Sequence, residues 1–365
     1  MSLDCQVVAL VTAPPDCGSI TARRIRRSPA PGKRCVSLAR RNSQFGQFFG
    51  RGRLPSLTLH PFPWRESGTP RYQVSNELDD PDGHGGYARG YRFDERGLPF
   101  TDGENGPLYD PLVVARYGIR MLAISGVRSS PVAAEQAHLV LEPLVVSAAP
   151  TGAWGRAGHP DAMSSDPPSA LVQGVGLSAL VRLSGPEPSL RVRNAIERAF
   201  ERLAAPVEQG GTVATLGGLP FLEEYPSRPP SHVLNGALYA LFGLYDLEDA
   251  LGHARAAALA RDVERAIERA LPRFDVALGW SRYALCLRGR AMLSSAQYHH
   301  LHVAGLRLLA ERTGRSAFTE RADRWERALQ SRWRRTPMAV AKAFEIVLER
   351  RVLDTRTGEL LRGGR

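Results

Sequence analysis

The sequence lacks the long hydrophobic runs that a membrane-spanning helix requires. No stretch of its 365 residues approaches the roughly 18 consecutive apolar positions needed to cross a bilayer. An apolar content of 43% still allows a substantial core, in one large domain or two of ordinary size. We therefore expect a soluble protein without a membrane span.

Cysteine is scarce, with four residues in the whole chain. Cys5, Cys17 and Cys35 lie near the start without CxxC spacing, and Cys286 stands alone. In a chain of this length the pattern indicates neither a disulfide framework nor a metal site. The opening MSLDCQVVAL carries an acid where an export signal would carry Lys or Arg, so no signal peptide is evident and the compartment stays open.

Several catalytic signatures are missing as well. No GxSxG turn, P-loop or dinucleotide-binding glycine pattern follows a predicted strand. Serine hydrolase, NTPase and NAD-dependent functions therefore lack support.

Acidic residues are rare in the first sixty positions, which hold ten Lys or Arg against two Asp. Most of the net charge of +11 therefore belongs to this segment. Its Arg, Ser, Gly and Pro content predicts a disordered basic arm over residues 1–63. Basic residues without interleaved aromatics are a poor nucleic-acid platform, so we expect no specific nucleic-acid partner.

Residues 64–107 combine turn signals with short alternating pieces such as GYARGYRFDERGLPF. They predict a small β-rich region with a hairpin turn at Asp94–Gly97.

From residue 108 to 335 long helical stretches follow one another in a repeating pattern. Four helices, apolar nearly all round, share the pattern G-[IL]-x-x-L, and each precedes a second helix that is usually more charged. The pattern glycines are Gly118, Gly176, Gly243 and Gly305. Such hairpins must stack to bury their faces, and the glycines would let inner helices approach closely. We predict a mainly α fold, an incomplete α/α toroid, followed by a C-terminal helix and tail over residues 336–365.

In such a toroid the loops leading into the inner helices gather at one end of the bowl. Three of these segments carry polar and aromatic side chains suited to a carbohydrate: EEYPSRPPSHVLNG, GWSRYALCLRGR and QYHHLH. Their candidate site residues are Glu223, Glu224, Tyr225, Asn235, Trp280, Arg282, Tyr283, Tyr298, His299, His300 and His302. The YHHLH spacing offers a His pair, but without a recognisable third ligand we predict no metal.

These residues resemble the C-terminal catalytic domain of the D-glucuronyl C5-epimerases. FLEEYPSRPPSHVLNGALYALFGLYDLEDA is similar to that family's hallmark segment. LYDPLVVARYGI, SALVQGVGLSALVRL, GWSRYAL and QYHHLHVAGL resemble further family segments in order and spacing. The resemblance covers roughly Tyr109 to Arg335.

The resemblance implies an isomerase that inverts C5 of D-glucuronate to L-iduronate in a heparosan-like polysaccharide, without a nicotinamide cofactor. It implies that Tyr225 and Tyr298 are opposed acid/base groups, that Glu224 assists Tyr225, and that Asn235 and Tyr283 line the substrate pocket. We add Gln173 and His302 as substrate-binding candidates. From charge alone, we add Arg282 and Arg288 as partners for the uronate carboxylate. The partner is then an anionic uronic-acid polysaccharide, and a homodimer is possible.

Two departures from the family pattern lie near this site. Ala284-Leu285-Cys286 stands where Asp-Leu-Arg or Asp-Leu is usual, and Val175 replaces the second Gln of Gln-Gly-Gln. Both remove polar groups, which bears on substrate identity. Two alternatives therefore stay open: a polysaccharide lyase that takes the same C5 proton and eliminates the C4 substituent, and a non-catalytic anionic-glycan-binding protein.

Overall fold

A computed structural model describes residues 57–61, 70–76, 92–103, 106–128, 131–148, 151–155, 168–185, 187–287 and 290–362. The predicted arm over residues 1–63 lies outside these ranges apart from one strand, and so do Cys5, Cys17, Cys35 and Arg288.

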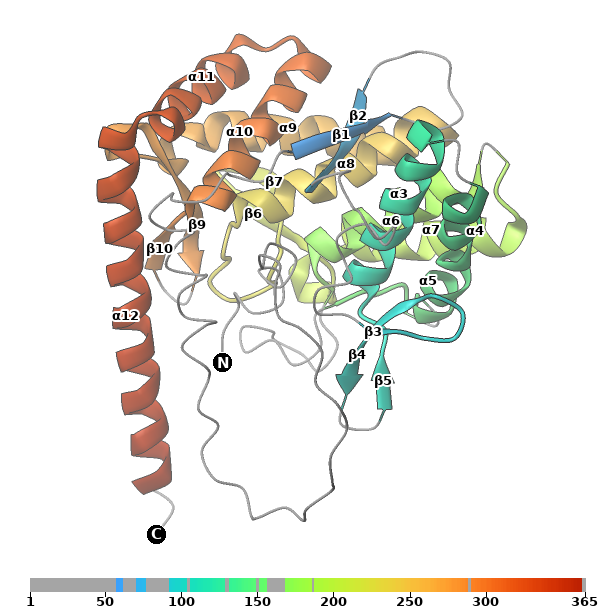
Figure 1. Cartoon of the computed structure of the whole chain (residues 1–365). Coiled ribbons are helices and arrows are strands. Elements are labelled where there is room, and N and C mark those ends of the chain that lie inside the picture. Colours follow the sequence, from blue (N-terminus) through green and yellow to red (C-terminus); the bar gives the residue numbers. More distant parts are fainter. Residues whose placement is uncertain are drawn as a thin grey trace, which may run out of the picture.

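Helices dominate the described chain (Figure 1). The α-helices are α3 (Pro111–Arg128), α4 (Pro131–Leu139), α5 (Leu141–Ser147), α6 (Ala170–Ser184), α7 (Leu190–Ala204), α8 (Leu234–Leu251), α9 (Ala254–Phe274), α10 (Ala296–Thr313), α11 (Ser316–Gln330) and α12 (Arg332–Arg362). The strands are β1 (Leu57–Pro61), β2 (Pro70–Asn76), β3 (Arg92–Phe93), β4 (Pro99–Gly103), β5 (Gly106–Leu108), β6 (Val213–Leu216), β7 (Leu219–Leu222), β8 (Asp275–Val276), β9 (Trp280–Leu287) and β10 (Arg290–Leu293). Short 3-10 turns cover Val207–Gln209 and Ala277–Gly279.

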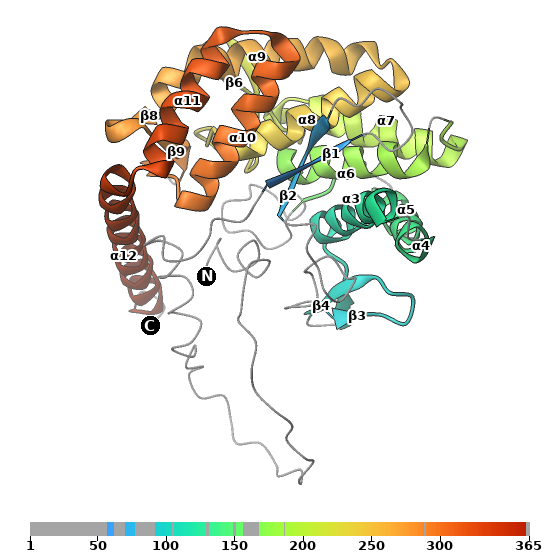
Figure 2. The ribbon, with the colours of Figure 1, turned by 45° about the horizontal axis from the view of Figure 1, so that its top comes forward.

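The helices form two concentric layers around an arc (Figure 2). The inner layer is α3, α6, α8 and α10, in which α6 packs against both α3 and α8, and α8 against α10. Each inner helix is backed by an outer partner: α4 and α5 behind α3, α7 behind α6, α9 behind α8, and α11 behind α10. The outer helices α7, α9 and α11 bury one apolar stripe, whereas α6 and α8 are buried nearly throughout. The predicted incomplete α/α toroid is confirmed.

Close approach of the inner helices depends on glycine, as the sequence predicts for Gly243. A Cβ at Gly243 would lie 2.5 Å from the Gly174 carbonyl oxygen of α6. A Cβ at Gly174 would lie 2.4 Å from the Cα of Ala240. No side chain fits at such distances, so α6 and α8 pack backbone to backbone. Gly176 differs from the prediction, because it faces the Trp154 ring instead of a neighbouring inner helix.

A buried ion pair joins the same two helices further along. The Arg182 guanidinium donates to both carboxylate oxygens of Asp246, at 2.7 and 2.9 Å. Both side chains are almost fully buried. Replacing either residue would therefore leave the other one charged and unpaired in the core.

The β-rich region and the first outer helix agree with the sequence in part. β3 and β4 pair antiparallel around a turn in which Asp94 Oδ1 accepts from the amides of Arg96 and Leu98, which confirms the predicted hairpin. The segment PVAAEQAHLVLEPLVV, predicted as one partner helix, divides into α4 and α5. Pro143 has no N–H to donate to the Leu139 carbonyl, so the helix breaks between them.

Two strand insertions interrupt the helical repeat before inner helices. The β6–β7 hairpin precedes the loop into α8, and the antiparallel β8–β9–β10 sheet precedes α10. β2 lies against α8 and α10 on the inner side of the arc. Within the described residues, none of the helices has the length and apolar character of a membrane span.

Candidate active site

The loop that begins with Glu223-Glu224-Tyr225-Pro226, called the EEYP loop below, is held in place by the side chain of Glu223. Glu223 is fully buried, and its side chain accepts hydrogen bonds from the Ser231 hydroxyl at 2.6 Å and from the amides of Ser231 and His232, each at 2.9 Å. The Glu223 backbone carbonyl also accepts from the amide of Ala170 at the start of α6. Glu223 therefore closes the loop on itself and ties it to a neighbouring inner helix.

The far end of this loop pairs with β9. The amides of Leu285 and Cys286 donate to the carbonyls of His232 and Ser231, and Val233 forms an isolated bridge with Ala284. This pairing brings the two segments together, although Val233 and Ala284 lie 284 − 233 = 51 residues apart in the sequence.

Tyr283 occupies an irregular position on β9. Leu293 of β10 pairs with Arg282 and Met292 pairs with Ala284, so Tyr283 is an extra residue between two consecutive partners. Such a bulge redirects a side chain away from regular strand alternation. Tyr283 packs in one buried cluster with Tyr225, where they are 8% and 4% exposed.

Tyr298 completes a group of three phenols. It lies in the first turn of α10, where its amide donates to the capping hydroxyl of Ser295. Its half-buried ring packs against the Tyr225–Tyr283 cluster, and the Tyr283 and Tyr298 ring centroids are 4.7 Å apart. The loop before α8, the bulged strand and the start of α10 thus each contribute one tyrosine.

Glu224 lies beside the first turn of α8. It is 2% exposed, and its Oε2 accepts from Asn235 Nδ2 at 3.2 Å. A Cβ at Gly236 would lie 2.4 Å from the Glu224 Cβ and 2.8 Å from Oε2, so only glycine admits this approach. The N-terminal end of a helix carries partial positive charge, which favours a carboxylate there. Glu224 therefore lies beside the tyrosines at the positive end of the α8 dipole.

The electrostatics of this group distinguish Tyr283 from its neighbours. Burial raises the pKa of Tyr283 well above 10, and the charges of Glu224, Tyr225 and Tyr298 and a side-chain hydrogen bond with Tyr225 act in the same direction. Tyr283 therefore keeps its proton and can donate it in a hydrogen bond to the Tyr225 oxygen. A donor in that position stabilises the ionised form of Tyr225.

One cation near the site was not singled out from the sequence. Arg116, on α3, holds its guanidinium carbon 5.2 Å from the ring centroid of Tyr239 on α8. Burial raises the pKa of Tyr239, Arg116 opposes this through its charge and a hydrogen bond, and Glu224 adds to it. Tyr239 lies four residues after Asn235 and so shares its face of α8. No carboxylate in the described chain forms a salt bridge with Arg116.

The structure does not bring Gln173 into this group. Its side-chain amide donates to the carbonyls of Gly152 and Ala199, both at 2.9 Å, and its oxygen accepts from the amide of Trp154. Gln173 is fully buried and fastens α6 to α7 and to the loop before α6.

His302 also lies in a separate buried network. Ser281 Oγ is 2.8 Å from Nδ1 of both His302 and His299. The His299 ring stacks on Trp280 with 3.8 Å between centroids, and its Nε2 donates to the Trp325 carbonyl at 3.0 Å. Burial lowers the pKa of His299 to about 3 and that of His302 well below 6.5. Both rings are neutral and link α10 to β9 and α11.

Among the remaining predicted residues, Arg282 is half-buried on β9 beside Tyr283 and forms no ion pair with a described residue. Arg288 lies outside the described residues. At the two departures from the family pattern, Ala284 is fully buried in the tyrosine cluster and Val175 is fully buried in the main core. Apolar residues at these positions fit their surroundings.

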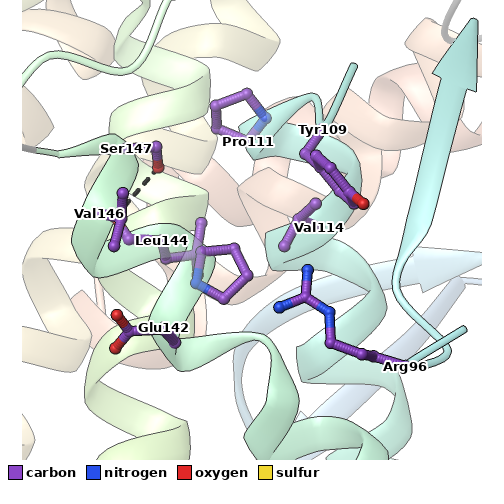
Figure 3. A pocket seen from close by; sticks show the side chains of 9 residues that line it. Arg96, Tyr109, Pro111, Val114, Glu142, Leu144, Val146 and Ser147 are labelled. Carbon is purple, nitrogen blue, oxygen red and sulfur yellow. Dashed lines mark hydrogen bonds between the residues drawn. The ribbon is translucent and has the colours of Figure 1, made fainter. Parts of the chain in front are cut away.

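A cavity of about 350 Å³ lies between the β3–β4 turn, the start of α3 and α5 (Figure 3). Its walls are mostly apolar, and the Arg96 guanidinium at its edge is hydrogen-bonded to Asp94. Within the described ranges, no group of three or more His, Cys, Asp or Glu residues is placed to hold a metal ion.

Parts of this chain are similar to known proteins. Residues 161–327 match the family described as D-glucuronyl C5-epimerase C-terminus. A D-glucuronyl C5-epimerase from Caenorhabditis elegans is 29% identical over 171 residues, which is 43% of this chain and 28% of that protein. Among solved structures, cellobiose 2-epimerase from Bacillus thermoamylovorans aligns with a TM-score of 0.49 and 12% identity over 67% of each chain.

The matched region contains the EEYP loop, α8, β9 and α10, which together carry all three tyrosines and Glu224. The resemblance found in the sequence is confirmed over residues 161–327, which match the C-terminal region of the D-glucuronyl C5-epimerases.

Proposed function

We propose that this protein is an isomerase that inverts C5 of D-glucuronate to L-iduronate within a heparosan-like polysaccharide. The observation that carries the proposal is the group of Tyr225, Tyr283 and Tyr298 beside the buried carboxylate of Glu224. The chain spans about 28% of the length of the curated relative, so the activity of that relative is a proposal for this protein.

The reaction needs two opposed proton-transfer groups. A base removes the C5 proton from one face of the sugar ring, and the electron pair moves into the adjacent carboxylate as an enolate. An acid then returns a proton to C5 from the other face, so no electrons are gained or lost. Phenols suit both steps, because a nearby donor or cation can lower their ordinary pKa of about 10.

In this proposal Tyr225 and Tyr298 carry out the two transfers. The Tyr283 hydroxyl supports Tyr225 in its ionised form, since burial keeps Tyr283 protonated. Glu224 assists Tyr225, as the family resemblance implies. Oδ1 of Asn235 is buried without a hydrogen-bond partner in the described chain, and a substrate hydroxyl could donate to it.

The enolate places extra negative charge on the substrate carboxylate, which must be offset. Arg116 suits this role because it lies near Tyr239 and Glu224 without an acidic partner in the described chain. Arg282 is a second candidate, from its place beside Tyr283. No step in this scheme requires a nicotinamide or a metal.

Solvent exchange tests the proposal directly. The protein is incubated in D₂O with non-sulfated and with N-sulfated heparosan, and NMR reports deuterium at C5 of the uronate. We expect incorporation together with L-iduronate, and loss of both in Tyr225→Phe and in Tyr298→Phe. Tyr109→Phe is the matched control, because this phenol bonds to Asp94 away from the cluster.

The same experiment separates the alternatives. An unsaturated uronate absorbing in the ultraviolet would identify a lyase and reject epimerisation. Salt-sensitive binding of the polysaccharide without any exchange would identify a non-catalytic glycan-binding protein.

A further inference from the structure

The C-terminal helix α12 has two opposite faces of unusual character. It runs along one edge of the molecule, and its first half lies against α11 and β10 (Figure 1). The face turned toward the body carries Met338, Ala339, Lys342 and Glu345. Met338 packs on the Trp280 cluster, and Glu345 accepts from the Leu293 amide at 3.2 Å.

The face turned away from the body is apolar. Trp333 is 88% exposed, Val340 51%, Phe344 65%, Val347 45% and Leu348 42%. With the exposed Pro337, the positions from Trp333 to Val347 follow spacings of four, three, four and three residues, and Leu348 comes four residues after Phe344, so all lie on one side of a helix. We call Trp333, Pro337, Val340, Phe344, Val347 and Leu348 the outer stripe.

Charge is absent from this stripe. Between Thr336 and Leu348 the sequence contains two charged residues, Lys342 and Glu345. They pair with each other at 2.8 Å, and Lys342 is 8% exposed. The usual arrangement of a surface helix, charged outward and apolar inward, is therefore reversed over four turns. Exposed apolar side chains do not stabilise a helix in water, whereas burying them against a partner does.

We propose that the outer stripe docks a second copy of this chain, stripe against stripe. A two-fold contact uses the same patch on both partners, and the body of each copy lies behind its own α12, clear of the contact. A standard interface buries about 800 Å² per partner, roughly 65% of it apolar in homodimers. The exposed parts of Trp333 and Phe344, together with those of Val340, Val347 and Leu348, offer about 500 Å² of apolar surface. This is close to the apolar area that such an interface buries on each partner.

The small residues beside the outer stripe favour a helix as the docking partner. Ala341 and Ala343 flank the stripe at partly buried positions, and small side chains allow two helices to approach closely. The bulky Trp333 and Phe344 then become the anchors of the interface, because aromatic side chains contribute most where they are fully desolvated.

Sedimentation velocity of the full chain over a range of concentrations tests the proposal. We expect a dimer for the wild type and a monomer for Val340→Lys/Phe344→Glu, with unchanged circular dichroism. Phe344→Ala removes apolar area without adding charge and should weaken dimerisation at least about tenfold. The control is Val132→Lys/Leu190→Glu, which charges two equally exposed apolar residues on α4 and α7 and should leave the dimer intact.

Three results would overturn the proposal. The first is a wild type that stays monomeric at all concentrations, and the second is a dimer that survives Val340→Lys/Phe344→Glu. The third is a control variant that dissociates as well, which would indicate non-specific apolar association. A monomer that co-sediments with phosphatidylcholine–phosphatidylserine vesicles through Phe344 would assign the stripe to a membrane surface instead.

Discussion

The aromatic rings of Tyr283 and Tyr298 lie 4.7 Å apart between centroids and are inclined by 54°. One ring comes from a bulged strand and the other from the first turn of a helix, and Tyr225 joins them from a third segment. This packing brings three tyrosine side chains from three segments together beside Glu224.

Replacing Tyr283 by phenylalanine should move the pH dependence of proton exchange. Tyr283 stays protonated because its pKa is raised well above 10, and it can stabilise ionised Tyr225 by donating a hydrogen bond. A hydrogen bond to a charged group contributes about 1.5–3 kcal/mol, or roughly one to two pKa units. Tyr283→Phe should therefore shift the rising limb of the C5 exchange rate to higher pH by about one unit or more.

A uniform loss of rate at every pH, without such a shift, would show that Tyr283 does not act on the ionisation of Tyr225. Tyr245→Phe is the comparison for loss of a buried phenol, because its hydroxyl bonds to Glu264 between α8 and α9. It should lower the melting temperature without moving the pH profile.

Arg116→Gln should weaken use of the anionic substrate. Without this guanidinium the charge of Glu224 is less well offset at the substrate carboxylate, so we expect kcat/KM to fall on the order of tenfold to a hundredfold. The loss should diminish at high salt, which screens the same interaction. Arg92→Gln is a matched control, because Arg92 also stacks on an aromatic ring, Phe100, but on β3. Equal losses in both variants would remove Arg116 from the proposed site.

Gly236→Ala should act through Glu224. The new Cβ would lie 2.4 Å from the Glu224 Cβ, so the carboxylate must move. Displacements of about 1 Å near reacting groups can cost on the order of a hundredfold in rate. The double variant Gly236→Ala/Glu224→Gln should lose no more activity than Glu224→Gln alone, since both changes disable one group. Additive losses in exchange rate would show that Gly236 acts elsewhere.

Folding stability should fall as the pH drops below about 6.5. Neutral His299 accepts from the Ser281 amide at Nδ1 and donates to Trp325 at Nε2, so a second proton on Nδ1 would break the bond from that amide. Its pKa of about 3 in the folded state lies below the unfolded value of 6.5, so the unfolded chain binds more protons between these limits. The penalty from His299 grows as the pH falls through this window and reaches about 2 kcal/mol at pH 5.

Urea unfolding at pH 7 and pH 5 measures this difference. In His299→Gln the drop in unfolding free energy between the two pH values should be smaller than in the wild type by about 2 kcal/mol, whatever the variant's stability at pH 7. His138→Gln, at an exposed position on α4, should keep the wild-type drop. An unchanged drop in His299→Gln would show that His299 does not cause the acid sensitivity.

Local patterns were sufficient to predict much of this architecture. The apolar faces around Gly118, Gly176, Gly243 and Gly305 predict inner helices, since a helix buried on both sides cannot carry charge outward. The turn at Asp94–Gly97 follows from residues that favour a tight turn. The single helix predicted after α3 was wrong because Pro143 acts on a carbonyl four residues back.

The sequence by itself determined the stacked helical hairpins, the similarity of residues 161–327 to the D-glucuronyl C5-epimerases and the grouping of Tyr225, Tyr298 and Glu224 in one proposed site, because these depend on periodicity and on contiguous motifs. Tertiary structure decided which other residues join them. Gln173 and His302 are polar and lie in matching motifs, yet Gln173 makes its hydrogen bonds inside the core and His302 bonds to Ser281 in a separate buried network. Arg116 reaches Tyr239 from another helix, and the Tyr283 bulge exists only once β9 and β10 pair. Contacts between distant segments depend on how helices and strands pack, and a linear pattern does not record that.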